Sequence, residues 1–365
     1  MRSNDHIIYY DFNNLDYSSY FLTGFHQNTE TFLYKFKVSK NIPPLLFDKK
    51  VGDKWKKILF SICLFKAKLT NEEFYFCIDT RDSCDANPNK GNGYHLPLLK
   101  KVRYYFKVNY NIDAINNDPN LRDFANKIIP ALPFFSIKCP TLLPYRPRII
   151  SCSTVAWTWK DTVQRVRMLK GMLPLEQVRH MRNSVKDLDI FFVLNYYHQK
   201  VHSADNEFRY QIMKEIQKHP NINSLVGFTS HEKIVPDKYA DLQLKPYSLE
   251  EYLGCLAKSR IAIYVRGLHN CLSFKFSQLL LLGMPIVGQT VHNNEDNIMN
   301  NELFDEQFAF DDPKEIVQEA IKLLDDPEKQ MALGESNANV FDTKFTPKAV
   351  VSDILRHLNI KELVA

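Results

Sequence analysis

The segment between residues 260 and 289 combines two cations with a loop and a helix start, which suits the binding of an anion. The apolar strand pattern RIAIYV is followed by Arg266 in a loop, and Lys275 begins the helical pattern FKFSQLLLLG. Amides at a helix N-terminus and a nearby cation both attract a phosphate group. We therefore predict that Arg266 and Lys275 contact a diphosphate, with ordinary solvated charges as the alternative.

Three other residues have the chemistry of a general base. His26 lies in the segment YFLTGFHQN, which we expect to be the loop after the first strand, and a histidine pKa is near neutral. Gly24 in the same segment would permit close backbone approach to a ligand. Asp79 and Asp82 follow the strand pattern FYFCID and are rival bases. The run Asp-Thr-Arg-Asp is as readily a local salt bridge as a metal site, so we expect no metal.

The second half of the chain alternates strand and helix patterns, which predicts a parallel sheet. Strands are expected at 189–197, 223–228, 260–265 and 285–289, with helices at 205–218, 247–259 and 274–283. Ser248 and Glu251 are spaced as a capping box at the start of the second of these helices. Ligands bind beyond the carboxyl ends of such strands, so residues just after each strand should line the site.

The length of the chain, 365 residues, exceeds that of one ordinary hydrophobic core and predicts two domains. Three prolines in CPTLLPYRPRII (139–150) suit an extended connector. We place an N-terminal domain at 1–145, the connector at 146–185, a second domain at 186–345, and a C-terminal helix at 346–365 that could pack back on the first domain.

Composition excludes several other classes of protein. A net charge of +5 is mild, and the basic residues alternate with apolar ones, so no nucleic-acid partner is expected. The absence of an 18-residue apolar run or a signal core predicts a cytoplasmic protein, with peripheral contact at the inner membrane face left open. With only 11 glycines and no GxGxxG after a strand, a dinucleotide-dependent oxidoreductase is excluded.

The segment YVRGLHNCLSFKFSQLLLLGMPIVGQ (264–289) resembles the nucleotide-sugar-binding signature of GT-B glycosyltransferases, including the group 1 and exostosin-like enzymes. The matching positions are Arg266, Gly267, Ser273, Lys275, Gln278, Gly283 and Pro285. The resemblance extends over residues 186–350. It implies an α/β GT-B fold, with two Rossmann-like domains and a cleft between them. The first domain would bind the acceptor and the second would bind the nucleotide-sugar.

The resemblance also implies roles for individual residues. Asn195, Tyr196 and Lys200 would lie near the diphosphate, and Tyr247 near the nucleobase. The complete expected donor site is Asn195, Tyr196, Lys200, Tyr247, Arg266, Gly267, Asn270, Ser273, Lys275 and Gln278. The two glutamates of the family pattern fall here on Asn270 and Gln278. An amide can hydrogen-bond a ribose hydroxyl, but it cannot serve as a charged acceptor.

The function implied is transfer of a sugar from a nucleotide-sugar donor to a hydroxyl of a glycan or lipid-linked glycan, as in polysaccharide biosynthesis. We expect positioning and neutralisation of the leaving diphosphate to supply most of the rate, without a metal or a further cofactor. His26, on the wall expected to face the cleft, would remove the acceptor proton, with Asp79 and Asp82 as rivals. Because Asn270 and Gln278 are not acidic, a non-catalytic binding or scaffold protein with a degenerate donor site is the alternative.

Overall fold

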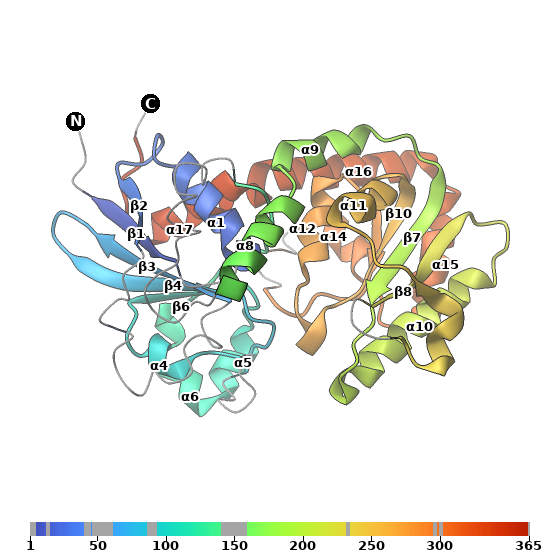
Figure 1. The fold of residues 1–365 in the computed structure, drawn as a ribbon, viewed down its shortest axis with the longest axis horizontal. Helices are drawn as coiled ribbons and strands as arrows, with labels where there is room; N and C mark the ends of the chain where they lie inside the picture. Colours follow the sequence, from blue (N-terminus) through green and yellow to red (C-terminus); the bar gives the residue numbers. More distant parts are fainter. Residues whose placement is uncertain are drawn as a thin grey trace.

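The computed structural model describes residues 5–11, 15–39, 45, 61–85, 93–139, 159–230, 234–294, 298 and 302–363. These residues contain two sheets that lie side by side along the long axis of the molecule (Figure 1). The proline-containing part of the expected connector, residues 140–158, lies outside the described residues, as does the first part of the strand pattern at 57–65.

The first sheet has six strands in the order β2-β1-β3-β4-β5-β6. Their bounds are β1 His6–Tyr10, β2 Lys35–Ser39, β3 Ile62–Lys68, β4 Glu73–Asp79, β5 Tyr104–Lys107 and β6 Ile128–Pro130. Strand β3 is antiparallel to both neighbours, whereas the other pairs are parallel. The sheet is therefore mixed, because β3 and β4 are joined by a short hairpin connection in place of a crossover helix.

The helices of the first half are α1 Leu15–Gln27, α4 Leu96–Leu99, α5 Ile112–Asn117, α6 Pro119–Arg122 and the 3₁₀ turn η2 Ala125–Lys127. Helix α1 packs against the C-terminal helix α17, Pro347–His357, which returns to the first sheet (Figure 1). A Cβ atom on Gly24 would lie 2.1 Å from the Pro347 carbonyl oxygen. Gly24 therefore permits the close approach of two helices, and the prediction that it allows approach to a ligand is wrong.

The second sheet is wholly parallel, in the order β11-β10-β7-β8-β9. Its strands are β7 Leu188–Asn195, β8 Ser224–Thr229, β9 Gln243–Leu244, β10 Ser259–Tyr264 and β11 Ile286–Gly288. Numbered within this domain, the order is 3-2-1-4-5, which is that of a Rossmann sheet. The chain reverses direction across the sheet between β7 and β10, and ligands bind at the carboxyl ends of strands at such a point.

Helices cover both faces of the second sheet (Figure 1). The connecting helices are α8 Trp159–Gly171, α9 Leu175–His180 and η4 Met181–Asn183; the domain then holds η5 Lys200–His202, α10 Ser203–Gln217, η6 Asp237–Leu242, α11 Leu249–Ala257, η7 Leu268–Asn270, α12 Phe274–Leu281, α14 Glu302–Gln307, α15 Pro313–Leu324, α16 Pro327–Val340 and the π-helical turn η8 Phe341–Phe345. The predicted capping box at the start of α11 is confirmed, since Ser248 and Glu251 exchange both hydrogen bonds. None of the described helices is long and apolar enough to cross a membrane.

The two domains share one continuous hydrophobic cluster. Rings of the first domain meet Phe274 of the second, with centroid distances of 4.8 Å from Phe134 and 5.8 Å from Tyr17. The Asn294 carboxamide adds hydrogen bonds from the second domain to the carbonyls of Val108 and Ala131. Two α/β domains that meet in this way, with a terminal helix returning to the first, confirm the predicted GT-B fold class.

Candidate functional site

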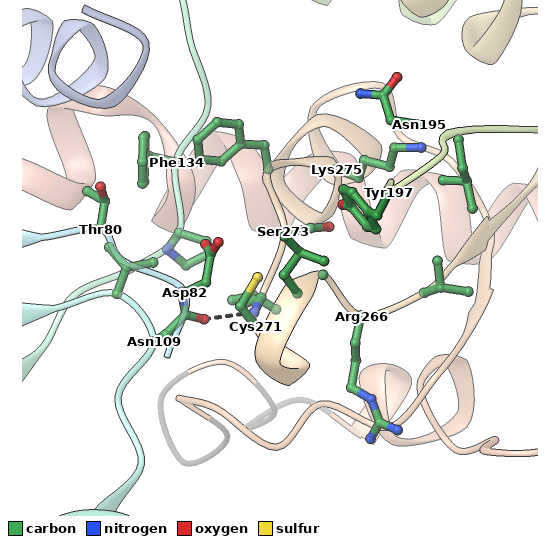
Figure 2. Close-up of a pocket in the computed structure, with 18 of the residues that line it drawn as sticks. Thr80, Asp82, Asn109, Phe134, Asn195, Tyr197, Arg266, Cys271, Ser273 and Lys275 are labelled. Carbon is green, nitrogen blue, oxygen red and sulfur yellow. Dashed lines mark hydrogen bonds between the residues drawn. The ribbon is translucent and has the colours of Figure 1, made fainter. Parts of the chain in front are cut away.

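A pocket of about 250 Å³ lies between the two domains. Its walls are formed by residues that follow strands β4, β5 and β6 on one side and strands β7 and β10 on the other. Figure 2 shows the polar side chains that converge on it from both domains. The pocket thus occupies the carboxyl edge of the second sheet, at the position where the strand order reverses.

Lys275 lies in the first turn of α12 and lines this pocket. Its ammonium donates to the Val193 carbonyl at 3.0 Å and lies 4.9 Å from the centroid of the Tyr252 ring. No carboxylate pairs with it among the described ion pairs. Burial, with the neighbouring charge of Arg209, holds the pKa of Lys275 well below its usual value. The site therefore destabilises the charged form of Lys275 as long as no anion is present.

Arg209 on α10 is a second cation in the pocket wall and is only 4% exposed. Its guanidinium lies 4.5 Å from the centroid of the Tyr197 ring and donates to the carbonyls of Asn195 and Arg266, at 3.4 and 3.3 Å. Within the described part of the chain, it too lacks a carboxylate partner. Two enclosed cations without a counter-charge are costly, and an anion in the pocket would remove that cost.

The N-terminal end of α12, where Ser273 is the N-cap, lines the same pocket as these two cations. The Ser273 hydroxyl makes no capping hydrogen bond, however, and its buried oxygen has no hydrogen-bond partner among the residues that the structure describes. The first amides of a helix also lack partners within the helix. The hydroxyl, the helix start and the two cations together form a group of donors suited to phosphate oxygens.

Asp82 lies across the pocket on the first domain, in the loop after β4. Burial raises the pKa of its carboxyl group, and a hydrogen bond with the Cys271 thiol and the charge of Lys107 only partly oppose this shift. A carboxylate with a raised pKa is a stronger base than an ordinary one. Of the three predicted bases, Asp82 is therefore the one that lines the pocket and could reach a ligand there.

The other two predicted bases, Asp79 and His26, do not line this pocket. Asp79 is fully buried beneath the pocket, where it accepts a hydrogen bond from Tyr105 and lies 3.4 Å from the Lys107 ammonium. Burial alone would raise the pKa of Asp79, but Lys107 and Arg81 hold it below its usual value. His26 belongs to the last turn of α1 and lines a separate depression. The predicted strand–helix loop at this position is helix, because its apolar residues face the core.

The structure brings together half of the predicted donor site. The pocket is lined by Asn195, Arg266, Gly267, Ser273 and Lys275. The Arg266 guanidinium is ion-paired with Asp311, with 3.0 Å between the charged groups. Its expected contact with a diphosphate stays a prediction.

The remaining predicted donor residues do not line the pocket: Tyr196, Lys200, Tyr247, Asn270 and Gln278. Tyr196 packs among aromatic rings, 5.6 Å from Phe228, and Lys200 is exposed in η5. Tyr247 contacts the Phe191 ring. Both tyrosine rings pack against a phenylalanine ring of the second sheet, and their expected donor contacts stay predictions.

The two positions where the family has glutamates are also outside the pocket wall. Asn270 is exposed, with a left-handed φ of 58°, and its carbonyl accepts a hydrogen bond from Asn293. Gln278 is 8% exposed and faces the interior of the second domain. Their expected contacts with a ribose stay predictions.

Sequence reasoning missed Arg209, Tyr197 and Asn109, all of which line the pocket. A signal existed for Tyr197: side chains alternate along a strand, so Asn195 and Tyr197 share a side that Tyr196 does not. Arg209 had no comparable signal, since it is one of several charged residues on an amphipathic helix. Among the described residues, no cluster of three His, Cys, Asp or Glu side chains could hold a metal ion.

Comparison with known proteins finds structural similarity only. No family model and no curated protein sequence matches this chain. Staphylococcus aureus TarM is 9% identical, with a TM-score of 0.43, over 76% of this chain and 50% of TarM. WaaG, a glycosyltransferase of lipopolysaccharide biosynthesis, is 11% identical over 96% of this chain and 97% of its own, with a TM-score of 0.42. The UDP-GlcNAc 2-epimerase of Neisseria meningitidis is 13% identical over 76% and 69%, with a TM-score of 0.40. This chain spans about half the length of the TarM structures.

Proposed function

We propose that this chain transfers a sugar from a nucleotide-sugar donor to the hydroxyl group of an acceptor. The observation that carries the proposal is the pair of enclosed cations, Lys275 and Arg209, which share one pocket without a carboxylate partner among the described ion pairs. The unpartnered Ser273 hydroxyl at the start of α12 supports the same assignment. A diphosphate bound there would meet both charges and the helix N-terminus.

The first domain supplies a carboxylate to the pocket, and the second domain supplies two cations. The acceptor oxygen attacks the anomeric carbon, the bond from that carbon to the diphosphate oxygen breaks, and the acceptor proton passes to Asp82. Lys275 and Arg209 neutralise the diphosphate as it departs, which is an interaction that strengthens in the transition state. The carbonyl of Val193 already holds the Lys275 ammonium in place, so little reorganisation is needed.

Calorimetric titration with nucleoside diphosphates tests the anion site. We expect binding to the native chain, weaker binding after Lys275→Ala or Arg209→Ala, and unchanged binding after Lys200→Ala, because Lys200 is an exposed lysine outside the pocket. Nucleotide sugars that bind are then incubated with hydroxyl acceptors, in the presence of EDTA, and products are identified by mass. Failure of every nucleotide to bind would overturn the proposal.

A non-catalytic binding protein is the second candidate, because Asn270 and Gln278 offer no acidic group to a ribose. The two candidates share the anion site and differ in turnover. Tight binding of a nucleotide sugar, without release of the nucleoside diphosphate in the presence of any acceptor, would favour the binding protein. Formation of a glycosylated product would exclude it.

A further inference from the structure

Asn109 connects the two domains at the pocket through both ends of its carboxamide. It follows β5 and is 1% exposed. Its amide nitrogen donates to the Arg81 carbonyl at 3.2 Å, and its oxygen accepts from the Leu272 amide at 2.7 Å. The second of these bonds crosses between the domains and is drawn in Figure 2.

Each hydrogen-bond partner of Asn109 is next in sequence to a residue that has a role in the proposed reaction. Arg81 immediately precedes Asp82, and Leu272 immediately precedes Ser273, the N-cap of α12. We propose that Asn109 is a positioning residue, which sets the separation between the Asp82 carboxylate and the anion-binding start of α12. This proposal rests on the proposed function, since it assigns Asn109 to the transfer reaction.

The first-domain end of this bridge is firmly anchored. The Arg81 carbonyl also accepts from the buried Lys107 ammonium at 2.7 Å, and Lys107 is ion-paired with Asp79. The loop that carries Asp82 is therefore fixed to strand β5 independently of Asn109. Asn109 adds a link to the second domain beside the hydrogen bond between Asp82 and the Cys271 thiol. A misplacement of reacting groups by about 1 Å can cost ~10²-fold in rate.

Hydrogen exchange measured by mass spectrometry or NMR tests the bridge without any substrate. In Asn109→Leu, we expect the Leu272 amide to exchange about tenfold faster, because its hydrogen bond to the Asn109 carboxamide oxygen is lost. The amides of residues 80 and 81 should keep their protection, because they donate to Ser61 and Asp79 and because Lys107 still holds the Arg81 carbonyl. Asn109→Asp retains an acceptor for Leu272, so the Leu272 amide should exchange at the native rate. Exchange of the Leu272 amide that is unchanged in Asn109→Leu would overturn the proposal.

Measurement of kcat distinguishes a positioning role of Asn109 from a purely structural one. Asn109→Leu should lose ~10²-fold in kcat, while the Kd for the nucleoside diphosphate stays within about twofold, since Asn109 is not among the cations that hold it. Asn109→Asp, which keeps the acceptor for the Leu272 amide, should retain most of the native kcat. Asn109→Ala, which also lacks this acceptor, keeps the test valid if Asn109→Leu fails to fold. A normal kcat in Asn109→Leu or Asn109→Ala, with exchange altered as expected, would also overturn the positioning role.

Asn294→Gly is the matched control. It removes two side-chain hydrogen bonds between the domains, to the carbonyls of Val108 and Ala131, and glycine accepts the left-handed φ of 62° at this position. The Val108 carbonyl belongs to the peptide unit before Asn109, but neither bond contacts Asp82, Leu272 or α12, so stability should fall while the bond from Leu272 to Asn109 and kcat are retained. An equal loss of kcat in Asn294→Gly would show that any weakening of the interface suffices, and would overturn the specific role of Asn109. Absence of turnover in the native chain would refute the proposed function. The exchange experiment would still show whether Asn109 links the two domains, because it needs no substrate.

Discussion

Lys275 and Arg209 lie on different helices, α12 and α10, and both line one pocket between the domains. Burial and the Arg209 charge together lower the pKa of Lys275, so each cation makes the other less stable. Such an arrangement persists in a folded protein when a ligand compensates for it.

Truncation of either cation should weaken anion binding. For Lys275→Ala we expect a loss of ~1–3 kcal/mol in nucleoside diphosphate binding, which is the scale of a charge-assisted hydrogen bond. Arg209→Ala should lose as much, because its guanidinium lies in the wall of the same pocket and Arg209 is only 4% exposed. Calorimetry measures both losses, and unchanged affinity in both variants would contradict the assignment.

Removal of the Lys275 charge should stabilise the empty protein. Its folded pKa is lowered, so the unfolded chain binds more protons between that pKa and the ordinary value of about 10.4. The Lys275 contribution to the free energy of unfolding therefore rises with pH across this window and is least favourable below it. Lys275→Met should be more stable than the native chain at pH 7 and should lack this rise. Thermal unfolding from pH 7 to 10 measures the difference, and a less stable variant at pH 7 would contradict the prediction.

The sequence predicted local features better than those that depend on distant packing. The capping box of α11 and the cluster of Gly267, Ser273 and Lys275 each arise within one strand–loop–helix segment, so their spacing alone positions them. Asp79 and Asp82 could not be distinguished, because the difference arises from Tyr105 and Lys107 on the neighbouring strand.

Two further differences have the same physical origin. The helical start at Leu15 was missed because α1 is apolar on most sides, with Tyr20, Phe21 and Phe25 all buried. The short connection at 69–72 indicates a hairpin between β3 and β4. The aromatic-rich composition of the strands does not by itself show whether neighbouring strands are parallel or antiparallel. Tertiary packing and strand pairing therefore decided what propensity left open.

The packing of α1 on α17 gives a prediction on stability. Gly24→Ala should lower the free energy of unfolding by ~1–3 kcal/mol, because the added methyl group overlaps the Pro347 carbonyl and forces the helices apart. Gly254→Ala in α11 is the matched control, since a methyl group added there would meet no atom within 4 Å, and it should gain ~0.5–1 kcal/mol. Urea titration measures both, and equal effects of the two substitutions would exclude the steric explanation.

Asp82 gives the most direct prediction on catalysis. Asp82→Asn should reduce turnover by ~10²–10⁴-fold, the usual contribution of a general base, while leaving nucleoside diphosphate affinity intact. Because burial raises the pKa of Asp82, activity should fall as the pH drops through a value above the ordinary carboxyl range. This acid limb of the pH–rate profile should be absent from the residual activity of Asp82→Asn.

Two further variants distinguish Asp82 from the other two predicted bases. His26→Ala should keep normal turnover, since His26 lies in α1 outside the pocket. Asp79→Asn should lower the melting temperature, because it leaves the buried Lys107 without its ion-pair partner. Turnover that survives in Asp82→Asn but disappears in His26→Ala would transfer the role of base to His26. Activity retained in all three folded variants would mean that the acceptor proton leaves without a protein base, which would refute this mechanism and leave the anion site untouched.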